Sequence, residues 1–402
     1  MVVSEESFET EALAFLGANA ELRPPERAVF GEGSDDVSVL PEKSAEQEAV
    51  EVREAKQWAA KVFDAGFGWI TGPARYGGRQ LAASYQRLYS GLEARYSTPS
   101  QACRGIGLGM IAPTILAHAT DAARERYLRP LYRGDIIACQ LFSEPGAGSD
   151  LAGLQTRAVR DGDEWRITGQ KVWTSGAQYS DIGEIICRTN PEVEKHRGLT
   201  GFIVDMHAPG VEVRPLRQMT GGASFNEVFF EDVRVPADHL LGEVDQGWTV
   251  ALTTLMNERA AIGGGGGGVA TGASSLKRLT DLARHLGMSG DPLLRQRLAD
   301  LYIHLQVARF TNDRAQGKIK AWQLPGPELS IAKLSLTQNL GRIGEAASAV
   351  LGPRLVADSG EWGTYSWSRF VLGVPGMRIA GGSDEIMRNI IGERVLGLPK
   401  DR

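Results

Sequence analysis

Residues 143–150 read Ser-Glu-Pro-Gly-Ala-Gly-Ser-Asp, and this stretch marks a change in the character of the chain. Glycine, alanine and serine in its second half carry small side chains or none, so a ligand can approach the backbone closely. The segments before residue 138 have helical spacing of apolar residues, whereas those that follow are short and rich in β-forming residues. The stretch therefore lies at the entrance to a β-rich part of the chain.

The β-rich part continues to Pro236. Its predicted strands are separated by turn residues such as Asp161-Gly162 and Ala208-Pro209-Gly210. They cover residues 165–173, 182–187, 201–206, 211–216 and 228–235. Several short strands at this spacing indicate an antiparallel sandwich or barrel.

Helical patterns flank this insert on both sides. The predicted helices cover residues 55–63, 85–94, 111–132 (a helix, a short break and a second helix ended by Pro130), 293–314, 330–350 and 385–395. This order excludes the alternating strand–helix pattern of a Rossmann enzyme. We expect three domains: a helical one over residues 1–136, a β domain over 137–240 and a second helical one over 241–402.

Composition narrows the function further. The 402 residues carry a net charge of −5 without a Lys/Arg tract, which argues against a nucleic-acid partner. No apolar run reaches the length of a membrane span, and the acidic N-terminus is unlike a signal peptide. The three cysteines, Cys103, Cys139 and Cys187, form no ligand pattern, and the histidines are scattered, so we expect free thiols in a cytoplasmic protein and no metal site.

Four motifs, in order along the chain, resemble those of the acyl-CoA dehydrogenase family over about residues 50–400. They are residues 143–150, Gly-Gln-Lys-Val-Trp-Thr-Ser at 169–175, Phe-Phe-Glu-Asp-Val-Arg-Val-Pro at 229–236, and Gly-Ser-Asp-Glu-Ile at 382–386. The resemblance implies an α+β fold with an N-terminal helical domain, a middle antiparallel β-sandwich or barrel, and a C-terminal four-helix bundle.

The resemblance also implies FAD as cofactor. The residues that it places against FAD are Gln140, Phe142, Ser143, Gly148, Ser149, Trp173, Thr174, Ser175, Gly352, Ser383 and Glu385. Trp173 would shield the flavin ring; from composition alone it reads as a core aromatic residue. Ser383 or Asp384 would also suit the N-cap of the helix that starts near Glu385, and a helix N-terminus favours phosphate.

The family's reaction removes the α-proton of an acyl thioester while the β-hydrogen leaves as hydride. In many relatives the base is a glutamate in a Tyr-Glu-Gly-Thr run, but the corresponding position here is Gly381. Other relatives carry it on an earlier helix before an arginine, so the resemblance makes Glu258 the candidate base and leaves the Gly381 N–H to bind the thioester oxygen. A solvated surface carboxylate is the competing interpretation of Glu258. Arg259, Asn257 and Ser149 are the candidate contacts to CoA.

A second departure concerns the segment that reaches a neighbouring subunit's FAD in relatives. The family's Gln-x-x-Gly-Gly-x-Gly pattern survives here only as Gly352, and Arg284 is one residue out of register. This fits an α2β2 heterotetramer in which another chain supplies the missing contacts. A homotetramer with altered contacts is the alternative.

The predicted function is FAD-dependent dehydrogenation of an acyl-CoA to the 2,3-enoyl-CoA in lipid β-oxidation, with an electron-transfer flavoprotein as electron acceptor. The alternatives are a flavin monooxygenase or oxidase on the same fold, and a subunit that stabilises a catalytic partner. Six glycines, Gly263 to Gly268, follow Glu258. They cost a helix roughly 5 kcal/mol relative to alanines. They indicate either a local helix break or tight crossing, or a pocket widened for a bulky acyl group.

Overall fold

A computed structural model describes residues 4–24, 29–40, 42–264, 266–320, 327 and 329–400; for residues 259–264, 266–273, 315, 316 and 318–320 only the backbone is described. The chain is divided into two compact units. Unit 1 consists of Met1–Glu26, Lys43–Leu216 and Ala223–Thr254, and unit 2 of Arg27–Glu42, Arg217–Gly222 and Leu255–Arg402. None of the described helices is long and apolar enough to cross a membrane.

The helices of unit 1 are α1 (Glu5–Asn19), α2 (Ala45–Asp64), α3 (Ala83–Glu93), α4 (Ala112–His118) and α5 (Asp121–Arg133), and α6 (Gly247–Gly264) begins in this unit. The first three, α1, α2 and α3, contribute to a core that includes Phe8, Leu16, Trp58 and Ile70. Pro130 does not end α5, contrary to our expectation. A proline in the last turn removes few backbone bonds, and the helix ends at Gly134, whose φ of +86° is left-handed.

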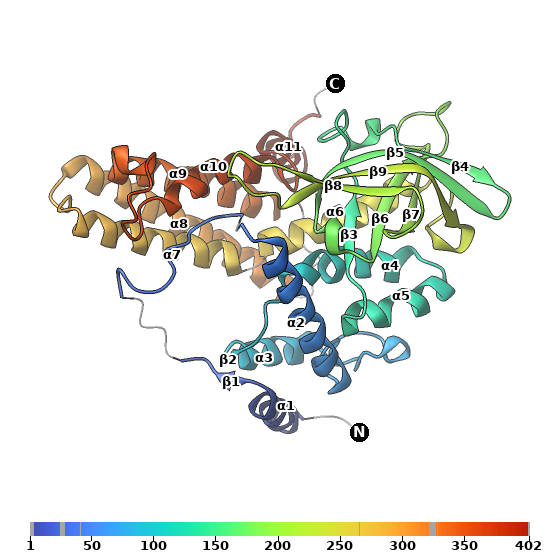
Figure 1. Ribbon diagram of the computed structural model, residues 1–402, viewed down its shortest axis with the longest axis horizontal. Helices are drawn as coiled ribbons and strands as arrows, with labels where there is room; N and C mark the ends of the chain where they lie inside the picture. The colour runs from blue at the N-terminus through green and yellow to red at the C-terminus, as the bar shows by residue number, and fades with distance from the viewer. Residues whose placement is uncertain are drawn as a thin grey trace. The chain divides into compact units, whose positions relative to one another are not determined.

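Unit 1 also contains a sheet of eight strands (Figure 1). Its strands are β3 (Ala138–Leu141), β4 (Arg157–Asp161), β5 (Glu164–Ser175), β6 (Ile182–Arg188), β7 (Leu199–Asp205), β8 (Val211–Leu216), β9 (Phe225–Pro236) and β10 (Leu240–Leu241). The strand order is β10-β7-β6-β4-β5-β9-β8, and β3 pairs with β6. All pairs are antiparallel except β3–β6 and β4–β6, which are parallel. A separate two-stranded sheet pairs β1 (Glu21–Leu22) with β2 (Tyr96–Ser97).

Unit 2 is a helical bundle, drawn from yellow to red in Figure 1. Its helices are α7 (Gly266–His285), α8 (Pro292–Lys320), α9 (Leu329–Leu351), α10 (Ser366–Ile379) and α11 (Asp384–Ile390). The apolar faces of α7, α8, α9 and α10 share a core that includes Leu279, Leu301, Ile343 and Phe370. The α+β class, with helices before and after a sheet, agrees with the sequence analysis.

Candidate active site

The 143–150 loop opens with a tight turn that follows β3. The backbone N–H of Glu144 donates to the carbonyl of Ala147, and the N–H of Ala147 donates back to that of Glu144, both at 3.0 Å. Pro145 and Gly146 lie exposed between them. Gly148 and Ser149 follow, also exposed, so the loop presents backbone that a ligand can reach.

A buried ion pair holds this loop in place. Lys171 on β5 is fully buried, and its Nζ donates to the Phe142 carbonyl at 3.0 Å and to Glu144 Oε1 at 2.9 Å. The Glu144 carboxylate also accepts from the backbone N–H groups of Gln155 and Thr156. Burial by itself would raise the pKa of Glu144, but the charge of Lys171 and these hydrogen bonds hold that pKa below its ordinary value.

Trp173 projects outward from β5 in a strained backbone conformation. Its φ is +63°, which non-glycine residues seldom adopt, and the β5–β9 register shifts between Lys171 and Thr174. The indole is 60% exposed and meets Phe225 edge-on. Strain of this kind persists where the surroundings enforce it, typically at ligand sites. Trp173 therefore exposes its aromatic ring, and the interpretation of Trp173 as a core residue is wrong.

Thr174 follows with its hydroxyl turned inward. The residue is 1% exposed, and its Oγ1 has no hydrogen-bond partner among the described residues. A buried unpaired hydroxyl costs free energy unless a ligand satisfies it. Of the other flavin candidates in unit 1, Phe142 is buried, whereas Gln140, Ser143 and Ser175 are half-buried. The Ser143 carbonyl accepts from the Val172 N–H, which ties the loop to the strand that carries Trp173 and Thr174.

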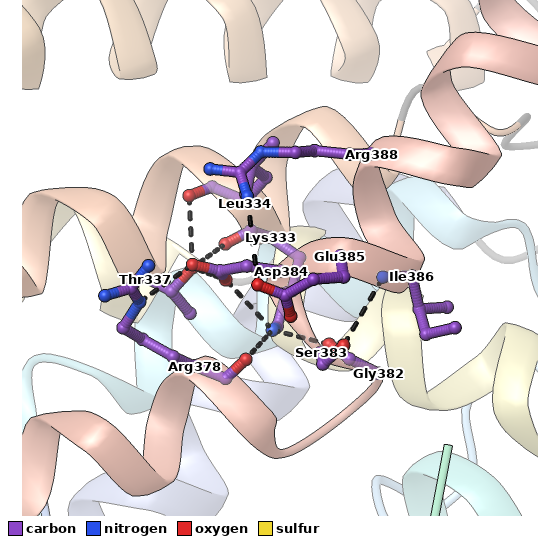
Figure 2. Close-up of polar contacts among 10 residues, drawn as sticks. All are labelled: Lys333, Leu334, Thr337, Arg378, Gly382, Ser383, Asp384, Glu385, Ile386 and Arg388. Atoms are coloured by element: carbon purple, nitrogen blue, oxygen red, sulfur yellow. Dashed lines mark hydrogen bonds and ion pairs between the residues drawn. The ribbon is translucent and has the colours of Figure 1, made fainter. Parts of the chain in front are cut away.

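In unit 2, Gly381 and Gly382 form a left-handed turn between α10 and α11, with φ of +66° and +91°. Figure 2 labels Gly382 in this turn. Ser383 is the N-cap of α11, because its Oγ accepts from the Ile386 N–H, whereas Asp384 is the first helical residue. Glu385 lies exposed in the first turn. Of the two residues that suit the N-cap by sequence, Ser383 and Asp384, the geometry selects Ser383.

The candidate base lies on α6. Glu258 and Asn257 are half-buried, and the side chain of Arg259 lies outside the described part of the chain. Gly352, with φ of +50°, begins the short 3-10 helix Gly352–Leu355 that follows α9. Gly263 and Gly264 end α6, and Gly266 begins α7; Gly265 is outside the described residues.

Three of the buried polar residues have no role assigned to them by the sequence analysis. Glu184 on β6 is fully buried; its Oε1 accepts from Thr254 at 2.6 Å, and its Oε2 has no partner among the described residues. Burial raises the pKa of Glu184 to about 8. Lys171 and Lys333 are the other two. Glu184 lies between Ile182 and Ile186 on its face of β6, and a charged residue within an apolar strand is the local signal that could have identified it.

Comparisons with known proteins agree with this arrangement of elements. Three family profiles match in order: the acyl-CoA dehydrogenase N-terminal domain at residues 36–135, the middle domain at 139–233 and the C-terminal domain at 245–396. The acyl-CoA dehydrogenase IpdE1 of Mycobacterium tuberculosis (strain ATCC 25618 / H37Rv) is 38% identical over 364 residues, covering 89% of this chain and 90% of that protein. The chain belongs to the acyl-CoA dehydrogenase family. It is therefore an oxidoreductase of a flavoprotein family that acts in fatty acid and lipid β-oxidation.

Two solved structures share the fold along their whole length. The Tcur3481-Tcur3483 steroid ACAD has a TM-score of 0.74 at 26% identity, covering 100% of both chains. The ChsE4-ChsE5 complex from Mycobacterium tuberculosis has a TM-score of 0.73 at 27% identity, again covering 100% of both chains. The first of these titles names a steroid ACAD, and the second names a complex.

Proposed function

We propose that this acyl-CoA dehydrogenase uses FAD to oxidise the Cα–Cβ bond of a bulky acyl-CoA to the 2,3-enoyl-CoA and passes the electrons to an electron-transfer flavoprotein. The observation that carries the proposal is the outward-facing Trp173, held at φ +63° beside the unpaired Thr174 hydroxyl. The flavin ring is flat and has a polar edge. It therefore requires an exposed aromatic side chain against one face and an unpaired hydrogen-bonding group at that edge.

The residues of unit 1 fit FAD. Trp173 would cover one face of the ring, while the hydroxyls of Thr174 and Ser143 and the side chain of Gln140 would meet its polar edge. Gly148 and Ser149 lie exposed, where backbone can approach phosphate, and Ser383 and Glu385 at the start of α11 are the further candidates, with Gly352. When bound, FAD supplies a hydride acceptor for the β-hydrogen.

The protein's own task is to make the α-proton acidic. Glu258 would take the proton, and the Gly381 N–H would donate to the thioester oxygen, where negative charge develops as the proton leaves. Arg259, Asn257 and Ser149 would hold CoA by charge and hydrogen bonds, fixing the reacting carbons in position.

The preference for a bulky acyl group draws on two supports. One solved neighbour is a steroid ACAD, and the glycine run follows Glu258 within a few residues of sequence. Glycines beside the base leave space that other side chains would fill. A steroid-like or branched thioester is therefore the substrate class that we propose.

We further propose a cytoplasmic α2β2 heterotetramer in preference to a homotetramer, because only Gly352 survives of the family's cross-subunit FAD pattern. The division into domains at residues 1–136, 137–240 and 241–402 is part of the same proposal. Co-expression with a second dehydrogenase chain, followed by size measurement and flavin counting, tests the assembly.

The test of function is anaerobic titration of the purified flavoprotein with short, long, branched and steroid-side-chain acyl-CoAs. We expect bleaching of the flavin absorbance, formation of the enoyl-CoA and reoxidation by an electron-transfer flavoprotein. Oxygen consumption stoichiometric with substrate would instead indicate an oxidase or monooxygenase. A colourless protein, alone and with its partner chain, would overturn the proposal.

A further inference from the structure

A buried lysine on α9, Lys333, forms hydrogen bonds with the backbone around Gly381. Lys333 is 1% exposed, and Figure 2 shows its ammonium group directed at the turn. Its Nζ donates to the Gly382 carbonyl at 2.6 Å and to the Arg378 carbonyl at 3.3 Å. The Arg378 carbonyl precedes Gly381 by three residues and the Gly382 carbonyl follows it by one. Lys333 therefore binds the backbone on both sides of Gly381.

A plain helix cap does not account for both contacts. The Arg378 carbonyl is among the last of α10, and a cation at a helix C-terminus is favourable. Gly382, however, lies beyond that helix and precedes α11. The shorter of the two bonds thus goes to the turn itself.

The ion pair with Asp384 does not account for the hydrogen bonds of Lys333. The nearest carboxylate oxygen, Asp384 Oδ1, is 3.7 Å from Nζ, which is longer than a hydrogen bond. Asp384 is satisfied by others: Thr337 Oγ1 donates to Oδ1 and Arg378 Nε donates to Oδ2, both at 2.8 Å. Asp384 balances the buried charge, while the hydrogen bonds of Lys333 go to main-chain carbonyls.

A left-handed Gly-Gly turn has many accessible conformations, because glycine adopts either sign of φ at little cost. Two carbonyls fixed by one buried ammonium group restrict that freedom. Holding the backbone on either side of Gly381 also restricts the directions that the Gly381 N–H can take.

We propose that Lys333 is a positioning residue, which keeps the Gly381 N–H aimed as the donor to the thioester oxygen of the substrate. The inference rests on the proposed function, because it assigns a support to the donor named there. Oriented donors matter most where charge appears in the transition state, and they matter less for binding of the uncharged thioester.

The variant to make is Lys333→Met, which keeps the length of the side chain and removes its donors. We expect flavin reduction by saturating acyl-CoA to slow about 10–100-fold, with acyl-CoA affinity changed less than about threefold. Lys333→Gln, whose amide can still donate to one carbonyl, should fall between Met and wild type. If the methionine variant is not recovered folded, the glutamine variant carries the comparison.

Thr337→Val is the matched control. It removes a buried hydrogen bond from the same cluster, one helical turn along α9, but none to the carbonyls around Gly381. We expect it to lower thermal stability while flavin reduction stays within about twofold of wild type. Equal slowing in the two variants would overturn the positioning role.

A second readout reports on the thioester oxygen itself. A 3-oxoacyl-CoA loses its α-proton reversibly, and its bound enolate is followed by ultraviolet absorbance. In Lys333→Met the apparent pKa of the bound ligand should rise by about one unit for each tenfold loss of donor strength. An unchanged ligand pKa would contradict the inference. A wild-type protein that no acyl-CoA bleaches would instead contradict the proposed function.

Discussion

Lys171 Nζ lies 2.9 Å from Glu144 Oε1, and both side chains are buried beneath the loop that opens at Ser143. The same ammonium group reaches the Phe142 carbonyl. The pair therefore joins β5 to the loop. Several of the residues proposed to meet the flavin lie on these two segments, among them Ser143 on the loop and Trp173 and Thr174 on β5.

Lys171→Met should destabilise the protein strongly, because it leaves the Glu144 carboxylate buried and unpaired. We expect a loss of roughly 3–5 kcal/mol in the free energy of unfolding, measured by urea denaturation. Lys195→Met is the control, since its pair with Asp150 in the same loop is exposed and should contribute at most about 1 kcal/mol. Similar losses in both variants would contradict the assignment.

Glu184 should make the stability of the protein fall as pH rises. Its pKa is about 8 in the folded protein against an ordinary value of 4.5, so between these values the unfolded chain ionises while the folded chain keeps the proton. Each pH unit in that window costs about 1.4 kcal/mol from this group.

Glu184→Gln should therefore stabilise the protein at pH 7 by up to about a few kcal/mol, because the variant has no carboxyl group to keep protonated. It should also flatten the pH dependence of Tm between about pH 5 and pH 8. Glu231→Gln, which changes an exposed carboxylate on β9, should do neither. A Glu184→Gln variant with the wild-type pH profile would exclude a protonated Glu184.

Glu258→Gln should abolish most of the dehydrogenation while leaving substrate binding intact. A positioned general base contributes about 10²–10⁴-fold, so flavin bleaching should slow by that factor. The measurement is anaerobic stopped-flow absorbance, with the exposed Glu243→Gln as control. Bleaching at the full wild-type rate would show that another group takes the proton.

Trp173→Gly should separate stability from cofactor binding. Glycine relieves the left-handed strain, so the FAD-free protein should gain about 1 kcal/mol, while FAD affinity falls at least about tenfold as the aromatic cover is lost. Gln80→Gly, at another exposed left-handed residue with φ of +53°, should stabilise without affecting FAD. Unchanged FAD affinity in Trp173→Gly would contradict the proposed shield.

Gly265→Leu and Gly266→Leu test whether the glycine run widens the acyl pocket. If added side chains occupy that space, kcat/KM should fall more for a steroid-side-chain acyl-CoA than for a short one. A fall of equal size for every substrate would refute the pocket and favour a role in helix packing.

The sequence predicted the fold well wherever periodicity is local. The strand predicted at 211–216 coincides with β8, and the helix predicted at 330–350 differs from α9 by one residue at each end. The strands β3 and β4 were missed because they are short. The helix α10 was missed because Gly373, Pro375 and Gly376 disfavour a helix, which the buried Trp367 and Phe370 nevertheless stabilise.

The candidate site was predictable only where a motif names its residues. The motif indicated Trp173, but not its positive φ, which arises from the bulge in the β5–β9 pairing. Lys333 is 49 residues from the carbonyl that it binds most closely. Contacts of that range depend on how helices pack, and no local pattern in the chain encodes them.

The chain crosses from one compact unit to the other after residues 26, 42, 216, 222 and 254, and the last crossing falls within α6. Each unit is consequently assembled from several separate stretches of the polypeptide. A protease that nicks one crossing leaves the halves joined covalently at the others, and no single truncation yields either unit whole. Dissection into separately expressed pieces therefore requires circular permutation or split-chain complementation.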